Sequence, residues 1–165
     1  MRFIRFAVKL MVVHTATYIA AGMLALHFLY SNGFWDRAVA TGSMRPLTSK
    51  WVMFGPLFQP VRGFIYALAL WPLRDYICSR KYGWLSIWSL FLVFGILGTP
   101  GPAPGSMEAL IYTQAPFWSQ MRGMPEVVLQ TLAFSLLVFY WDRMSWEKDK
   151  QAAAHSNLTA SGRGM

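Results

Sequence analysis

The chain has 165 residues, which suits a single domain, and 55% of them are hydrophobic while only 13% are charged. A soluble domain carries about 25% charged residues, so this composition excludes an ordinary water-facing surface and predicts an integral membrane protein. The chain also contains 8 Trp, 7 Tyr and 12 Phe, and aromatic side chains are suited to the lipid–water boundary. The net charge of +8 does not indicate a nucleic-acid partner, because the basic residues cluster at predicted helix ends.

The first predicted transmembrane span covers residues 8–30. Residues 10–30 contain no Lys, Arg, Asp or Glu, although they include His14 and His27. At about 1.5 Å per residue, a helix of this length crosses a hydrocarbon core of about 30 Å. Basic residues precede the run, as they do in a cleaved signal peptide, but the run is longer than a signal segment and no cleavage site follows it closely. We therefore interpret it as a retained helix.

Small residues mark one face of this span. Thr17, Ala21 and Ala25 recur every four residues, and such a row allows two helices to approach closely in lipid. A polar connection follows over residues 31–50. Its segment 41–46, TGSMRP, could hold an anion through backbone N–H groups, but it lacks the Walker spacing and lysine, and we interpret it as an ordinary loop.

The second predicted span covers residues 60–78 and carries Arg62 near its start. Pro60 suits the first turn of a helix, so the main helix is expected to begin there. Pro72 is expected to kink its other end. Residues 51–59 form either an interfacial helix or a partly re-entrant segment, and both alternatives stay open.

The third predicted span covers residues 82–99, which carry no charge. A stretch rich in proline and glycine ends it and begins a long outer loop over residues 98–124. Within this loop, Ser106 is placed to cap a short helix over residues 107–113. Because the loop is apolar as well as long, we expect it to pack on the outer face of the bundle.

The fourth predicted span covers residues 125–141, with Pro125 at the first helical position. Beyond it, the helix is expected to continue into solvent as an amphipathic extension. The segment 155–165 is small and polar and is predicted to be a disordered tail. The predicted fold is therefore an all-α membrane domain, residues 1–154, with four transmembrane helices and a packed outer loop.

The distribution of charge predicts a multi-pass protein of the cell membrane with both termini in the cytoplasm. Cytoplasmic segments carry an excess of Lys and Arg. With the N-terminus inside, ten of the 15 basic residues fall on the cytoplasmic side. These residues are Arg2, Arg5, Lys9, Arg74, Arg80, Lys81, Arg143, Lys148, Lys150 and Arg163.

Five polar residues form the predicted ligand-binding set. Arg62 and Tyr66 share one face of the second span, and Glu126 and Gln130 share one face of the fourth. An arginine at membrane depth costs several kcal/mol unless it pairs or reaches water. We expect Arg62 to form an ion pair with Glu126 or, as the second choice, with Glu108.

This set has two interpretations. It forms an outward-facing pocket that holds an anionic head group or carboxylate, or it forms an ion pair that only fixes helix register. Neither a metal nor a cofactor is predicted. His14 and His27 point about 140° apart on one helix and cannot share an ion. Cys78 is the only cysteine, and we interpret it as a buried thiol rather than a lipidation site.

Three functions remain open. The first is an accessory or structural subunit of a membrane assembly, favoured by the small size and the small-residue row. The second is a transporter or channel-like protein for a lipid or small anion, which uses the polar set. The third is a membrane enzyme on a lipid-linked substrate with Glu108 or Glu126 as acid or base, although no catalytic motif supports it. The expected partners are the lipid bilayer and either further copies of the chain or a larger membrane complex.

Overall fold

The computed structural model describes residues 2–31, 33–42, 44–114 and 116–161, with side chains described as far as His155. The described residues are 80% helical and form no strand. This confirms the prediction of an all-α protein. The helices in chain order are α1 (Arg2–Phe28), α2 (Phe34–Ala40), α3 (Lys50–Met53), the 3-10 turn η1 (Gly55–Phe58), α4 (Gln59–Leu70), the 3-10 turn η2 (Trp71–Leu73), α5 (Arg74–Ser79), α6 (Gly83–Leu92), the π-helical turn η3 (Val93–Leu97), α7 (Met107–Tyr112), α8 (Phe117–Met121) and α9 (Met124–Ser161).

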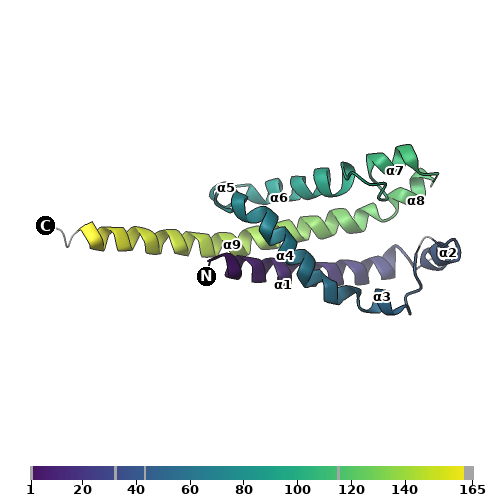
Figure 1. Cartoon of the computed structure of the whole chain (residues 1–165), viewed down its shortest axis with the longest axis horizontal. Coiled ribbons are helices and arrows are strands. Elements are labelled where there is room, and N and C mark those ends of the chain that lie inside the picture. The colour runs from purple at the N-terminus through teal and green to yellow at the C-terminus, as the bar shows by residue number, and fades with distance from the viewer. Residues whose placement is uncertain (1, 32, 43, 115, 162–165) are drawn as a thin grey trace.

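The long helical segments alternate in direction along one axis of the molecule (Figure 1). α1 and α6 run one way, whereas α4 and α9 run the other way. The N-terminus and α5 lie at one end of the bundle, which we call the N-terminal end. α2, α3, α7 and α8 lie toward the opposite end, which we call the loop end. α9 continues past the N-terminal end as a single projecting helix.

Within the described part of the chain, two helical segments, Arg2–Phe28 and Phe117–His155, are long and apolar enough to cross a membrane. The second segment comprises α8 and most of α9. The third predicted span corresponds to a shorter apolar helix, Gly83–Leu97. The second predicted span is not one continuous α-helix. α4 ends at Leu70, and Pro72 lies in η2 before α5 begins. Proline removes a backbone donor and its ring clashes with the preceding turn, which accounts for this interruption.

Residues 51–59 form short helical turns at the surface. α3 and η1 precede α4, with Pro56 in η1 and Pro60 in the first turn of α4. The predicted start of the main helix near Pro60 is therefore confirmed. Trp51 and Leu57 are exposed by 67% and 70%, so this lead-in directs large apolar side chains outward.

The outer loop contains α7 and α8. Ser106 Oγ accepts a hydrogen bond from the Ala109 N–H at 3.1 Å, which confirms the predicted helix cap. Ser106 and Ala109 are fully buried, whereas Tyr112 and Trp118 are exposed by 74% and 80%. The loop is thus anchored on one side only and presents aromatic side chains on the other.

The core lies where α1, α4, α6 and α9 meet. Gly63 permits a close crossing of α4 over α1, because a Cβ atom at this position would lie 2.6 Å from Met11 Cα. That distance is shorter than side chains tolerate, so the crossing requires glycine. The largest contributors to the core are Phe6, Leu10, Leu70, Ile87, Phe134, Val138 and Phe139.

α9 extends the fourth predicted span beyond the bundle, as expected for residues 142–154. The helix continues to Ser161. Residues 155–161, which the sequence analysis assigned to a disordered tail, are therefore helical, and residues 162–165 lie outside the described part of the chain.

Candidate functional site

A polar pocket of about 720 Å³ lies at the loop end of the bundle. We call it the loop-end pocket. Arg37 from α2, Arg62 from α4, and Glu126 and Gln130 from α9 line it, together with side chains from α1, η3 and α8. Its volume falls within the range of about 300–1,000 Å³ found for small-molecule sites. The helices meeting here bring two cations and one carboxylate to the same space.

Arg62 lies beside this pocket because the next residue, Gly63, is at the close crossing of α4 over α1. Gly63 packs against the main chain of Leu10 and Met11, so the rotation of α4 about its axis is restricted at this level. Arg62 itself is exposed. Among the described residues it forms no ion pair, which corrects the expectation that it pairs with Glu126 or Glu108. Its guanidinium is left available to an anion.

Glu126 has a different partner. The Tyr30 hydroxyl donates a hydrogen bond to Glu126 Oε2 at 2.9 Å. The Tyr30 ring stacks on Phe34, with ring centroids 5.3 Å apart, so the hydroxyl is held in place from α2. This bond joins the chain just after α1 to the first turn of α9. The Glu126 side chain is therefore oriented at the pocket wall by the Tyr30 hydroxyl and not by an arginine.

Tyr66 lies below Arg62 in a smaller cavity of about 90 Å³, which His14, Arg62 and Gln130 also line. Its ring contacts those of His14 and Phe91, at centroid distances of 5.0 and 4.7 Å. His14 is buried and its Nε2 donates to the Gln59 side-chain oxygen at 3.1 Å. Arg62 and Gln130 thus line both cavities. Of these two cavities, Tyr66 lines only the smaller one and Glu126 only the loop-end pocket.

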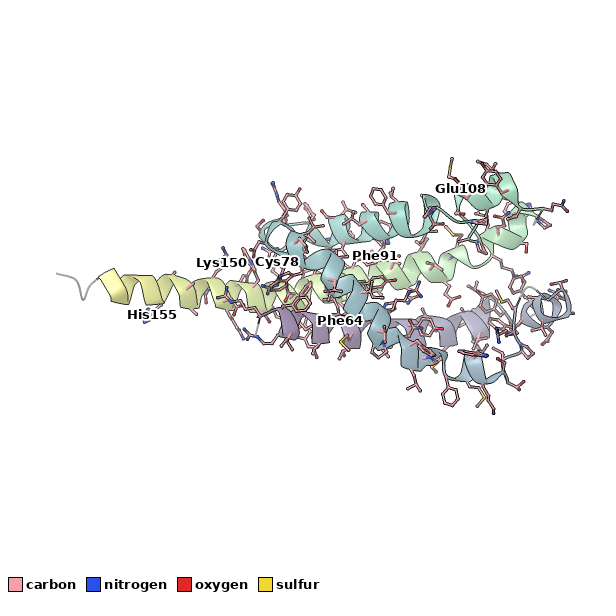
Figure 2. All side chains as sticks on the ribbon, viewed as in Figure 1. Phe64, Cys78, Phe91, Glu108, Lys150 and His155 are labelled. Carbon is pink, nitrogen blue, oxygen red and sulfur yellow. The ribbon has the colours of Figure 1, made fainter. Side chains whose placement is uncertain are left out.

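Glu108 does not belong to this site. It lies in the first turn of α7 in the outer loop (Figure 2) and lines neither of the two cavities. The enzyme hypothesis calls for two carboxylates that converge on one cleft. Only Glu126 of the two candidate acids reaches the loop-end pocket, so the described residues do not provide that pair.

An apolar groove of about 780 Å³ runs between α1 and α9. Its walls are alanine and leucine side chains, including Ala20 and Ala21 of α1 and Ala133 of α9. The groove and the loop-end pocket share Glu126 and Gln130 as lining residues. The small residues that were expected to allow close helix contact thus leave space for a groove along this part of the α1–α9 interface.

A second polar cluster, which sequence reasoning missed, lies at the N-terminal end. We call it the Asp142 cluster. Arg74 donates to Asp142 through Nε at 2.5 Å and Nη2 at 3.2 Å, and Lys9 Nζ donates to the same carboxylate at 3.0 Å. Lys9 also donates to Ser145 Oγ at 2.7 Å, and the Cys78 thiol lies 3.6 Å from Asp142 Oδ2. Asp142 is only 2% exposed.

The Asp142 cluster ties α1, α5 and α9 together. A buried carboxylate between two cations is fully hydrogen-bonded and stabilises one arrangement of these helices. The sequence contained one signal for it. Asp142 directly follows the apolar run of the fourth span, and Lys9 and Arg74 stand at the same predicted depth in the first and second. The sequence interpretation treated Asp142 as the first residue of the solvent-exposed extension of the fourth helix, and so did not predict a buried cluster.

The described side chains include no group of three or more His, Cys, Asp or Glu residues that could hold a metal ion. Comparison of the chain with protein-family models, curated proteins and solved structures finds no match.

Proposed function

We propose that this chain is a four-span membrane protein that binds an anionic group in the loop-end pocket, as a transporter or channel-like protein for a lipid or small anion would. In this proposal the N-terminal end faces the cytoplasm and the loop end faces outward. The observation that carries it is Arg62, a cation without an ion-pair partner among the described residues, which lines a pocket of ligand-binding size.

Two features support the four-span arrangement. The segments α4–α5 and α6–η3 each lead from one end of the bundle toward the other, where α4 crosses α1 obliquely and α6 runs alongside α9 (Figure 1). Large apolar side chains are also exposed on several faces, such as Met23 at 66%, Phe94 at 69% and Leu129 at 64%. Exposed apolar surface on this scale is unfavourable in water and favourable in a hydrocarbon layer. The basic residues at the N-terminal end are consistent with a cytoplasmic location.

The charges of the loop-end pocket support an anion as the ligand. Arg37 and Arg62 both line it and neither forms an ion pair among the described residues. The single carboxylate, Glu126, accepts a hydrogen bond from Tyr30 rather than from an arginine. A planar guanidinium with free N–H groups is well suited to bind phosphate or carboxylate oxygens.

The test is binding of glycerol phosphate to the purified protein in phosphatidylcholine nanodiscs, measured by calorimetry. A hydrogen bond to a charged group contributes about 1.5–3 kcal/mol, so Arg62→Gln is expected to weaken binding by about 10- to 100-fold. Arg80→Gln is the matched control, because Arg80 lies exposed at the other end, against Tyr76. Equal affinity in the Arg62→Gln and unmodified proteins would contradict the proposal.

A second candidate function is an accessory subunit of a membrane assembly. It is favoured by the apolar side chains that α7 and α8 expose, among them Ile111 at 66%, Tyr112 at 74% and Trp118 at 80%. Aromatic residues are enriched at protein interfaces. Purification in a mild detergent, followed by mass spectrometry of proteins and lipids, tests this alternative. A stoichiometric protein partner that is lost on Trp118→Ala would support it.

A further inference from the structure

We propose that the loop-end pocket and the apolar groove between α1 and α9 form one continuous site for an anionic phospholipid. The pocket holds the head group and the groove holds one acyl chain. This inference rests on the proposed function, because it assigns a ligand class to the same pocket.

The loop-end pocket and the groove share part of their lining. The pocket and the groove are separate spaces of about 720 and 780 Å³, yet Glu126 and Gln130 line both. These two residues stand one turn apart at the start of α9. The two compartments therefore border the same helical turn of α9. A ligand that occupies both would pass beside this turn.

The two compartments differ in the chemistry of their linings. The pocket contains two arginines without ion-pair partners and one carboxylate bound to Tyr30. The groove is walled mainly by alanine and leucine. Its hydroxyl, from Thr17, already donates to the main chain of α1 at 2.9 Å and so has no need of a polar ligand. An anionic head and a hydrocarbon chain match these two surfaces.

The length of the groove is close to the thickness of one leaflet of the membrane. The groove follows α1 from Ala16 to Phe28, which at about 1.5 Å per residue corresponds to about 18 Å. One leaflet of a hydrocarbon core about 30 Å thick measures about 15 Å. The groove thus begins at the loop end, where head groups lie in the proposed orientation, and extends approximately to the middle of the membrane. A single acyl chain fits this depth.

The small groove residues offer a direct test. Ala133→Phe places a ring in the groove without changing any charge. Ala69→Phe is the matched control, because Ala69 is exposed on α4 and lines neither the groove nor the pocket. The probe is phosphatidylglycerol with a photoreactive diazirine on one acyl chain. It is mixed into phosphatidylcholine vesicles that contain the purified full-length protein, and mass spectrometry locates the cross-links.

Cross-links are expected to concentrate on groove residues such as Leu24 and Leu129. They should fall severalfold in Ala133→Phe and in Arg62→Gln, and remain unchanged in Ala69→Phe. An even spread over other exposed apolar residues, such as Leu68 and Phe94, would overturn the inference, because it would indicate ordinary boundary lipid. So would an undiminished yield in Ala133→Phe.

The glycerol phosphate measurement separates failure of this inference from failure of the proposed function. If Arg62→Gln weakens glycerol phosphate binding but Ala133→Phe leaves the yield of acyl-chain cross-links unchanged, the phospholipid inference is wrong and the proposed anion pocket is retained. If glycerol phosphate binding and lipid cross-linking are both independent of Arg62, the proposed function is wrong as well, and the inference falls with it.

Discussion

The Arg74 guanidinium donates two hydrogen bonds to the Asp142 carboxylate, from Nε to Oδ2 at 2.5 Å and from Nη2 to Oδ1 at 3.2 Å. Residues 68 positions apart in the chain are thereby joined, and α5 is fastened to α9. Lys9 donates to the same carboxylate from α1. Because all three side chains are largely shielded from solvent, the loss of Asp142 would leave two unpaired cations in an environment of low polarity, whereas the loss of either cation would leave the carboxylate paired with the other.

We predict that Asp142→Asn lowers the free energy of unfolding by about 3–5 kcal/mol, since it leaves Lys9 and Arg74 without a counter-charge. The measurement is denaturant unfolding in mixed micelles. Asp149→Asn is the control, because the Asp149 ion pairs with Arg2 and Arg5 are exposed on the arginine side and should contribute less than about 1 kcal/mol. Equal losses in the two variants would show that burial of the Asp142 cluster has no energetic importance.

Gly63→Ala is predicted to destabilise the protein by about 1–3 kcal/mol, because the added Cβ would force α4 away from the Met11 main chain. Gly22→Ala is the matched control. No atom lies within 4 Å of a Cβ at Gly22, and replacing a helical glycine gains up to about 1 kcal/mol. The melting temperatures should therefore shift in opposite directions. A neutral Gly63→Ala would mean that the two helices do not cross closely.

Double-mutant cycles distinguish the observed partner of Glu126 from the expected one. Tyr30→Phe and Glu126→Gln should be non-additive in unfolding free energy by about 0.5–3 kcal/mol, as contacting residues are. Arg62→Gln and Glu126→Gln should add to within about 0.5 kcal/mol, because the two residues form no ion pair. Coupling between Arg62 and Glu126, with none between Tyr30 and Glu126, would contradict the structure of the pocket wall.

The proposed topology predicts which positions a membrane-impermeant maleimide reaches in intact cells. In a Cys78→Ser background, Met107→Cys on α7 should be labelled from outside. Lys148→Cys on α9 should be labelled only after the cells are permeabilised, since the basic end is expected to remain in the cytoplasm. Both positions are exposed, so access to the reagent is not limited by burial. If only Lys148→Cys were labelled in intact cells, the orientation of the protein in the membrane would be the opposite of the proposed one.

Local patterns in the sequence were sufficient to predict the helical character of the chain and several helix boundaries. Apolar runs and proline positions depend only on local chemistry, so the start of α4 near Pro60 and the Ser106 cap were predicted correctly. The helical spacing also placed Arg62 with Tyr66, and Glu126 with Gln130, because residues three or four apart share a helix face.

Which of these faces meet depends on packing between helices and could not be predicted from local patterns. The rotation and crossing of α1 and α4 are set by contact between Gly63 and the Met11 main chain, and no periodicity within one helix encodes such a contact. In the same way, the packing of α9 against other parts of the chain brings Glu126 to Tyr30 instead of Arg62, and Asp142 to both Arg74 and Lys9. Local spacing defines the face of each helix, whereas the choice of partner depends on packing between helices that are distant in the chain.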